Sequence, residues 1–220
     1  MPVELIRDER DREKRAAAEA AAELVEPGMR VGLGTGSTVA FLLPALTRRS
    51  LDCTYVATSP ATEQAALAQG LHVVSLDDVD SLDLAIDGAD QIAPNRWLIK
   101  GGGGAHTREK IVANLAERFI VIASADKLVE QLSAPVPLEL LRFGVGATLA
   151  AVAPAKLRDV PPSPDGNLIA DYLGAIDEEP TEVAAQLAGV PGVVEHGLFE
   201  PELVSDVLVA HGNQITNFGA

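Results

Sequence analysis

The sequence has only one cysteine, Cys53, in 220 residues, so the chain can form no internal disulfide. A single thiol is typical of a reducing compartment, and we therefore expect a cytoplasmic protein. The cysteine and the four histidines form no cluster with the spacing of a zinc site. No stretch reaches the roughly 18 continuous apolar residues of a membrane helix. The charged start MPVELIRDERDREKR also lacks the apolar core of a signal peptide, so no membrane partner is expected.

Basic residues are also scarce: 17 lysines and arginines stand against 32 acidic residues, which gives a formal net charge of −15. Such a charge repels nucleic acids and anionic membrane surfaces, so a nucleic-acid partner is not expected. An anionic ligand would have to be held by donors close to it. The hydrophobic content of 47% is high enough for a packed core.

Apolar strands alternate with helical segments in the first 125 residues. This alternation predicts a parallel sheet with helices on both faces, a Rossmann-like α/β fold. The expected strands lie at residues 29–33, 53–58, 71–76, 83–86, 96–100 and 119–124, and the expected helices at 8–28, 39–49, 61–70 and 109–119.

The pattern changes after Lys127. Strand-like segments surround a helical one, which predicts a small α+β domain. Residues 205–212 again resemble the earlier apolar strands, and we expect them to rejoin the first sheet. The predicted Rossmann-like domain covers residues 1–130 and 205–220, and the smaller domain covers 131–204. The later strands are expected at 135–141, 167–176 and 192–199, and the helix at 180–189.

Four polar motifs each follow an expected strand. Ligands of open α/β sheets bind at the carboxyl ends of the strands, so the motifs predict one shared crevice. They are GTGST at residues 34–38, DGAD at 87–90, KGGGG at 100–104 and SADK at 124–127.

The GTGST motif joins a strand to a helix. Its glycines allow backbone N–H groups to turn toward an anion, and the helix N-terminus adds partial positive charge. Thr35, Ser37 and Thr38 supply hydroxyl groups beside Gly36. Ser37 occupies the third glycine position of a dinucleotide fingerprint, and the lysine of a P-loop is missing. A tight structural turn is the alternative to phosphate binding.

The DGAD and KGGGG motifs carry the candidate acid–base groups. Asp87 and Asp90 could ligate a metal, move protons, or form a turn with a helix cap. Lys100 is a candidate to stabilise an oxyanion. Glu109 falls in the first turn of a helix, where a glutamate is also a favourable partner of the helix dipole. Lys127 has the alternative of an ordinary surface lysine.

GLGTGST, TSPAT, DGAD, KGGGGAHTREK, SADK and PVPLEL occur in this order along the chain. Together they resemble the signature of ribose-5-phosphate isomerase, type A, over nearly the whole sequence. The resemblance implies a two-domain α/β protein whose smaller domain is ferredoxin-like. It also implies an isomerase of the pentose phosphate pathway that interconverts ribose 5-phosphate and ribulose 5-phosphate. No metal or organic cofactor is implied, and the expected assembly is a homodimer or homotetramer.

The same resemblance implies roles for the motif residues. Glu109 is the base that moves a proton between C1 and C2 through an enediolate. Asp87 and Asp90 hold the sugar hydroxyls and assist ring opening, and Lys100 faces the developing oxyanion. Glu109, Asp87 and Lys100 form the catalytic set. The other substrate-binding residues implied are Thr35, Gly36, Ser37, Thr38, Gly88, Ala89, Gly101, Gly102, Gly103 and Lys127.

Some positions depart from the family pattern. Gln91 stands where a glutamate is usual, and His106 replaces an apolar residue near the expected base, where it could alter the pH dependence. SPDGN at residues 163–167 replaces the more usual TDNGN. The stretch between Phe143 and Asp165 is shorter than usual.

Two other functions compete with the isomerase. A non-catalytic phosphosugar sensor would keep GTGST but could lose the acid–base residues, all of which are present here. A nucleotide-dependent oxidoreductase is disfavoured because the third glycine of its fingerprint is missing. The isomerase is therefore the favoured interpretation.

Overall fold

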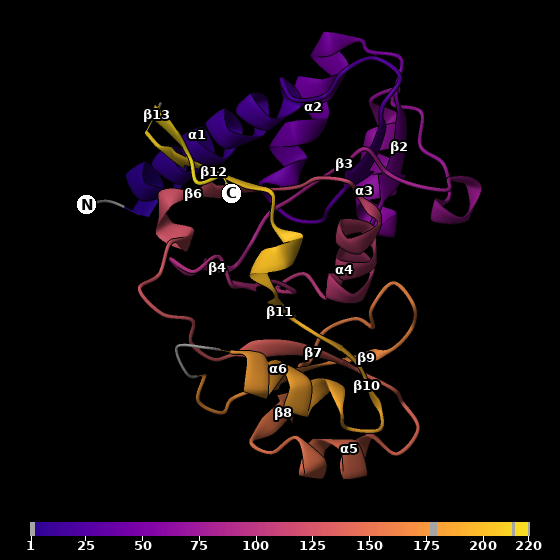
Figure 1. Ribbon diagram of the computed structural model, residues 1–220, viewed down its shortest axis with the longest axis vertical. Helices are drawn as coiled ribbons and strands as arrows, with labels where there is room; N and C mark the ends of the chain where they lie inside the picture. Colours follow the sequence, from indigo (N-terminus) through magenta and orange to yellow (C-terminus); the bar gives the residue numbers. More distant parts are fainter. Residues whose placement is uncertain (1–2, 177–179, 213, 220) are drawn as a thin grey trace. The chain divides into compact units, whose positions relative to one another are not determined.

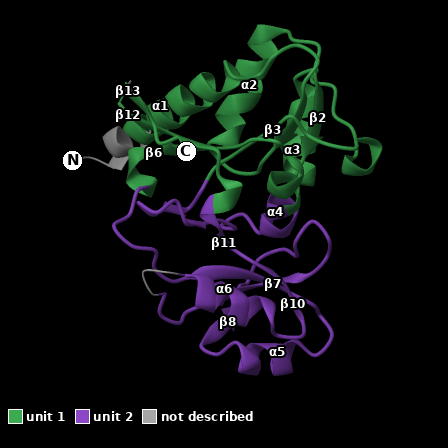
Figure 2. Ribbon diagram, in the orientation of Figure 1, with its two compact units in different colours: residues 1–88, 111–127, 202–220 green, residues 89–110, 128–201 purple. Residues whose placement is uncertain are grey.

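The computed structural model describes residues 3–176, 180–212 and 214–219 (Figure 1). The chain forms two compact units, which Figure 2 shows in different colours. Unit 1 consists of residues 1–88, 111–127 and 202–220, and unit 2 of residues 89–110 and 128–201.

Unit 1 is built on a six-stranded sheet with the order β13-β12-β6-β3-β1-β2. All neighbouring strands run parallel except β13, which pairs antiparallel with β12. The expected return of the chain to this sheet after residue 205 is confirmed by β12. The bounds are β1 Arg30–Leu33, β2 Thr54–Ala57, β3 Leu84–Asp87, β6 Phe119–Ser124, β12 Asp206–His211 and β13 Gln214–Asn217.

Helices cover both faces of this sheet. α1 (Val3–Ala22) and α2 (Val39–Arg49) share one apolar core with Val31 and Leu33 of β1. Gly32 lies between these two residues and therefore points to the other face. There a Cβ on Gly32 would meet Val112 of α4 (His106–Leu115), so the helix packs directly on the strand. The predicted parallel sheet with helices on both faces is confirmed; α3 spans Pro60–Ala68.

Two of the predicted strands of this sheet are wrong. Residues 71–76 form only a single parallel bridge, between Val73 and Tyr55, at the edge next to β2. Residues 96–100 contain β5 (Leu98–Ile99), which pairs with β4 (Gln91–Ile92) and β11 (Leu198–Phe199) in a separate three-stranded sheet. The short connection between β4 and β5 folds the chain straight back, and such a return gives an antiparallel pair.

Unit 2 contains a four-stranded antiparallel sheet with the order β10-β7-β9-β8. Along the chain its elements follow as β7, α5, β8, β9, α6 and β10, which is the ferredoxin-like βαββαβ arrangement. The predicted ferredoxin-like fold is confirmed. The bounds are β7 Val136–Leu140, α5 Val145–Ala151, β8 Ala155–Leu157, β9 Leu168–Tyr172, α6 Thr181–Ala188 and β10 Val193–His196.

The two faces of this sheet differ in chemistry. Leu138 of β7 and Ala170 of β9 belong to an apolar core with Ala184 of α6. Side chains alternate along a strand, so Glu139 and Asp171 point to the opposite face. In Figure 2, α5 and α6 lie on one side of the sheet and the purple first turn of α4 lies on the other.

Residues 89–110 group with unit 2, whereas the predicted boundary at residue 130 assigns them to the larger domain. Strand pairing explains the difference. Within unit 2, β5 hydrogen-bonds to β11, and Lys100 N–H donates to the carbonyl of Gly197 at 2.9 Å. A Cβ on Gly197 would lie 2.2 Å from the Lys100 carbonyl oxygen, so the two backbones are in close contact there.

Two histidines are buried in unit 2. His106 is fully buried, and burial lowers its pKa from 6.5 to about 3. His196 is also buried, and burial, followed by the charge of Lys110, lowers its pKa to about 4. Both are therefore neutral near pH 7, and any effect of the His106 charge on the pH dependence is confined to acid conditions.

We predict that acid destabilises the protein through these two histidines. The unfolded chain binds their protons below about pH 6.5, whereas the folded chain does so only near pH 3 to 4. Their stabilising effect is full above pH 6.5 and is lost as the pH falls toward the lower values. The loss between pH 7 and pH 5 is on the order of 2 kcal/mol per histidine.

Urea unfolding at pH 7 and pH 5 measures this loss. His106→Leu should roughly halve it, because one of the two groups is then gone. The same change at His72, which is exposed, should leave it intact. An unaltered pH difference in His106→Leu would show that burial of this imidazole does not set the acid sensitivity.

Candidate active site

Three of the predicted motifs lie at the carboxyl edge of the sheet of unit 1. The loop containing Thr35 follows β1, Asp87 ends β3, and the 3₁₀ turn Ala125–Lys127 follows β6. Since β1, β3 and β6 are parallel neighbours, their carboxyl ends lie at the same edge. The fourth motif, KGGGG, follows β5 in unit 2, so the prediction that all four follow strands of one parallel sheet is wrong for it.

Asp87 organises the loop that follows β1. Its side chain is buried, and Oδ1 accepts the N–H of Thr35 at 3.1 Å and that of Gly88 at 2.7 Å. A Cβ on Gly34 would lie 1.9 Å from the Asp87 carboxylate, so only glycine fits there. The loop and the carboxylate therefore hold each other in place.

Hydroxyl groups support the same loop from β2 and the start of α3. The Oγ1 atoms of Thr35 and Thr58 are 2.8 Å apart, and Thr62 donates to the carbonyl of Gly34 at 3.0 Å. Thr58 and Thr62 belong to the TSPAT segment. Gly36 and Ser37, at the tip of the loop, remain exposed.

The other predicted residues of unit 1 lie at the same strand ends. Thr38 is buried directly before α2, and its Oγ1 would lie 3.8 Å from a Cβ on Gly88, so these two residues are neighbours. Lys127 is half-buried at the end of the turn that follows β6. At this edge of its sheet, unit 1 thus carries hydroxyl groups, backbone N–H groups, one carboxylate and one lysine.

The DGAD motif carries the chain from unit 1 into unit 2. Asp87 and Gly88 end the first segment of unit 1, and Ala89 and Asp90 begin unit 2. There the carboxylate of Asp90 accepts the N–H of Gly102 at 2.7 Å. The glycine loop and the second aspartate of the motif are therefore in direct contact.

Lys100 and Glu109 form an ion pair in the interior of unit 2. Lys100 Nζ lies 3.1 Å from Glu109 Oε2, and each side chain is 3% exposed. The pair places a carboxylate that can accept a proton beside a cation that can stabilise an oxyanion.

The glycines between Lys100 and α4 form a tight turn. Gly104 N–H donates to the carbonyl of Gly101 at 3.0 Å, and both residues have positive φ, +105° for Gly101 and +74° for Gly104. A Cβ on Gly101 would lie 2.6 Å from Nδ1 of His106, and one on Gly102 would lie 2.8 Å from Oδ1 of Asp90. Glycine is thus required by the backbone conformation and by neighbours within the protein itself.

Glu139 fixes the first turn of α4 from the sheet below it. This buried carboxylate on β7 accepts the hydroxyls of Thr107 and Ser163, each at 2.6 Å, and the amide of Asn167 at 2.8 Å. Three strong hydrogen bonds compensate for burial of its charge. Thr107 is thereby held two residues before Glu109.

Ion pairs fix the residues on either side of Glu109. Arg108 forks onto Asp165 at 2.6 to 3.1 Å and lowers the pKa of that carboxyl below its usual value. Lys110 Nζ lies 2.7 Å from Glu195. Burial lowers the pKa of Lys110; burial alone would raise the pKa of Glu195, but the charge of Lys110 brings it below its usual value.

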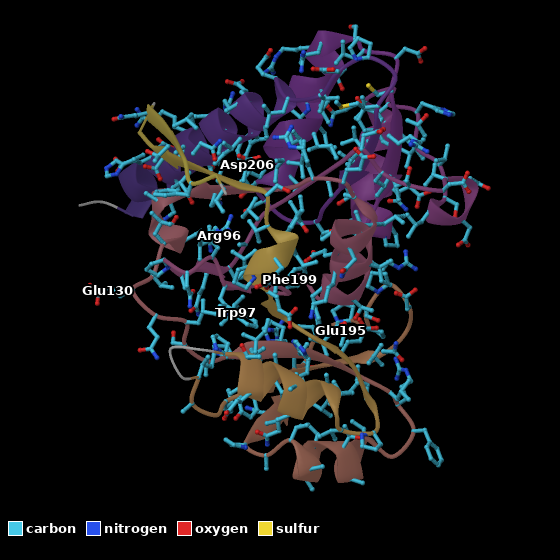
Figure 3. All side chains as sticks on the ribbon, in the orientation of Figure 1. Arg96, Trp97, Glu130, Glu195, Phe199 and Asp206 are labelled. Atoms are coloured by element: carbon cyan, nitrogen blue, oxygen red, sulfur yellow. The ribbon has the colours of Figure 1, made fainter. Side chains whose placement is uncertain are left out.

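Phe199 lies beside the buried Lys100 and the half-buried Lys110. Its ring centroid is 5.3 Å from Lys100 Nζ and 4.9 Å from Lys110 Nζ, and its side chain is fully buried. Figure 3 labels Phe199 of β11 and Glu195 of β10, the preceding strand along the chain. Because an aromatic face attracts cations, Phe199 stabilises two ammonium groups that have lost much of their water.

Sequence reasoning missed several residues that support this arrangement. Glu139 and Asp171 are charged residues flanked by apolar ones within expected strands, and this alternation places them on one face of the sheet. This alternation alone could have identified Glu139 and Asp171 as charged residues on the face opposite the apolar core. Nothing in the sequence indicates that Arg158 reaches the glycine turn, because 56 residues separate it from Gly102.

Two further properties concern the described residues only. No group of three or more histidines, cysteines, aspartates or glutamates among them is arranged to hold a metal ion. None of their helices combines the length and the apolar character of a membrane span.

Residues 54–214 match the family model of ribose 5-phosphate isomerase A (phosphoriboisomerase A). The chain is 48% identical to the ribose-5-phosphate isomerase A of Caulobacter sp. (strain K31) over 203 residues, which cover 86% of this chain and 90% of that protein. It is 45% identical to the one from Methanosarcina acetivorans over 201 residues, which cover 85% and 86% of the two chains.

Solved structures with the same name have the same fold. The ribose 5-phosphate isomerase A of Neisseria gonorrhoeae superposes with a TM-score of 0.90 at 32% identity, covering 96% of this chain and 97% of that one. A D-ribose-5-phosphate isomerase in complex with phospho-erythronic acid gives 0.87 at 35% identity, covering 94% and 97%. The family model and the relatives cover most of the sequence, and the chain belongs to the ribose 5-phosphate isomerase A family.

Proposed function

We propose that the protein interconverts ribose 5-phosphate and ribulose 5-phosphate, with Glu109 as the base that moves the proton. The observation that carries this proposal is the buried ion pair of Glu109 with Lys100, next to the glycine turn. Removing a proton from carbon needs a base shielded from water and a donor for the oxygen that becomes negative. The reaction is a step of the pentose phosphate pathway.

In the proposed reaction, Glu109 takes the proton from C2 of the open-chain aldose. The electron pair of that C–H bond forms the C1–C2 double bond of an enediolate, and negative charge develops on the C1 oxygen. Glu109 then returns the proton to C1, and the hydroxyl proton passes from O2 to O1. Lys100 and the turn of Gly101, Gly102 and Gly103 would stabilise the oxyanion.

The two aspartates of the DGAD motif are proposed to hold the sugar. Asp87, with Gly88 and Ala89, and Asp90 would bind the hydroxyl groups, and the aspartates would assist opening of the furanose ring. Their support in the structure is that each carboxylate already orients a neighbouring loop, Asp87 through Thr35 N–H and Asp90 through Gly102 N–H.

The phosphate is proposed to bind the loop of Thr35, Gly36, Ser37 and Thr38 together with Lys127. This loop precedes α2, whose N-terminus carries partial positive charge. Donors at close range are needed because the net charge of −15 repels a phosphosugar at long range.

A phosphosugar sensor without activity is not proposed. Such a protein needs a phosphate loop but no base, whereas this chain buries Glu109 against Lys100 and holds the surrounding turn with Glu139, Arg108 and Lys110. Burying two charges costs free energy of folding unless they are held in a favourable geometry with further polar partners. A protein without activity would have no need of such a pair.

We predict that Glu109→Gln lowers kcat by roughly 10² to 10⁴-fold or more, because glutamine cannot accept the proton. Substrate affinity should change little, since the proposed phosphate and hydroxyl contacts lie elsewhere. Ketose formation from ribose 5-phosphate, with a chelator present, and exchange of the C2 proton with solvent measure the effect. Wild-type exchange in a folded Glu109→Gln protein would remove Glu109 from the mechanism.

Stability must be measured beside activity, because the variant also takes away the charge paired with buried Lys100. Loss of one partner of a buried ion pair costs about 3–5 kcal/mol. The double variant Lys100→Met, Glu109→Gln should recover part of this stability and stay inactive. Glu182→Gln changes an exposed glutamate in the first turn of α6 and is the control for a simple helix-dipole effect. It should leave kcat nearly unchanged and alter the free energy of unfolding by no more than about 1 kcal/mol.

Phosphate recognition gives a second prediction for this site. Lys127→Ala should raise KM roughly tenfold or more, the scale of a lost charge-assisted hydrogen bond, and should leave kcat nearly unchanged. Lys156→Ala, at an exposed lysine of β8, is the matched control. Ribose without phosphate should be a very poor substrate; similar kcat/KM values for ribose and its 5-phosphate would refute the assigned phosphate site.

We also propose that the protein works in the cytoplasm as a homodimer or homotetramer. Its single cysteine is a buried free thiol, which fits a reducing compartment. Unit 2 exposes large apolar side chains, which mark interaction surfaces. They are Leu128 at 43%, Leu141 at 46%, Phe143 at 95%, Val160 at 52%, Leu173 at 49% and Val194 at 37% exposure.

Sedimentation velocity should show a dimer or tetramer that Phe143→Ser weakens. Phe218→Ser, at a 44% exposed phenylalanine of unit 1, serves as the control and should leave the assembly intact. A monomer at every concentration tested would contradict the proposed assembly.

A further inference from the structure

The glycine turn has a partner that the proposed mechanism does not use. Arg158 Nη1 donates to the carbonyl of Gly101 at 3.0 Å and to that of Gly102 at 3.3 Å. Its Nε and Nη2 donate to the two carboxylate oxygens of Asp171 at 2.9 and 2.6 Å. One guanidinium thus joins the turn to the four-stranded sheet.

The register of the sheet explains why these two side chains meet. Lys156 of β8 pairs with Asp171 of β9. Arg158 follows two residues after Lys156, so it lies on the same face as Asp171 and diagonal to it. On that face Ile169, two residues before Asp171, contacts Gly104, where a Cβ would lie 3.3 Å away. The side of β9 that turns away from the apolar core therefore supports the glycine turn.

The hydrogen bonds of Arg158 act on the groups that the mechanism needs. The carbonyl of Gly102 and the N–H of Gly103 belong to one peptide unit, so the bond at that carbonyl acts on the Gly103 donor. The carbonyl of Gly101 belongs to the preceding peptide unit, whose N–H, that of Gly102, donates to Asp90. A cation at the carbonyl fixes the orientation of the peptide plane and strengthens the N–H as a donor. A chain with two glycines in succession has no rigidity of its own to do this.

We propose that Arg158, oriented by Asp171, is a positioning residue that sets the backbone donors of the glycine turn for the developing oxyanion. The inference rests on the proposed isomerase mechanism and adds to it the reason for a second unit: its sheet carries the group that aligns the turn. Lysine cannot replace arginine, because an ammonium lacks the fork that grips a carboxylate and reaches two carbonyls at once.

Two conservative variants test the proposal. Arg158→Lys keeps the charge but loses the fork, and Asp171→Asn leaves Arg158 in place without the carboxylate that orients it. Each should lower kcat by about 10- to 100-fold, the scale of a lost supporting contact, with little change in KM for ribose 5-phosphate. The matched controls are Arg118→Lys and Asp206→Asn, the same substitutions in an Arg–Asp pair of unit 1 with an N···O distance of 2.8 Å; they should leave kcat unchanged.

Inhibition by phospho-erythronic acid separates positioning from general damage. In the proposed mechanism its carboxylate would carry negative charge where the enediolate oxygen forms, so we expect its binding to depend on the same donors as the transition state. In Arg158→Lys and Asp171→Asn its inhibition constant should rise by a factor similar to the loss in kcat/KM. Loss of folded protein would lower the apparent kcat and leave the inhibition constant unchanged, and this outcome would overturn the proposal.

Amide hydrogen exchange of the segment 100–105 gives a readout that does not need activity. Exchange should be faster in both variants than in the wild type and the controls. Unchanged exchange, or faster exchange with unchanged kcat and inhibition, overturns the role of Arg158 and leaves the isomerase mechanism standing. If the wild-type protein does not isomerise ribose 5-phosphate, the proposed function itself fails, whatever the exchange data show.

Discussion

Keeping two opposite charges buried at 3.1 Å from each other is the requirement on which unit 2 depends. A carboxylate and an ammonium taken out of water are tolerated only in a fixed geometry with further polar partners. The surrounding structure supplies that geometry: Phe199 lies beside Lys100, and Glu139 holds the helical turn that carries Glu109. The ferredoxin-like sheet therefore supports this ion pair with the polar side chains of one face, while its other face packs into the apolar core.

Most of the architecture could be predicted from the sequence, because apolar runs such as FIVIAS and turns such as DGAD have strong local signals. The predicted sheets failed where strand partners are chosen over long distances. RWLIK has the composition of a parallel strand, yet it pairs with the segment LF of residues 198–199, about a hundred residues away. For the candidate site, the motifs located the loops, whereas the contacts that orient the loops come from residues outside the four polar motifs, such as Glu139, which lies within PVPLEL, and Arg158.

The departures from the family pattern have local physical explanations in three cases. Gln91 accepts the N–H of Ser133 at 2.9 Å and donates to its carbonyl at 2.8 Å, a pairing that a glutamate could not complete. The SPDGN segment keeps its anchors, since Ser163 and Asn167 both donate to Glu139. His106 is buried in its neutral form against Gly101, and its Nε2 lies 3.4 Å from the carbonyl oxygen of Glu195.

The pairing of Arg158 with Asp171 has a consequence for how such a chain can change by recombination. Arg158 directly follows β8 and Asp171 lies in β9, 13 positions further on, and together they contact a turn that lies far upstream in the sequence. A chimera that inherits β8 from one parent and β9 from another would separate partners that work only together. Segment swaps between homologues should therefore place their crossovers outside residues 155–172, so that both strands of this hairpin come from the same parent.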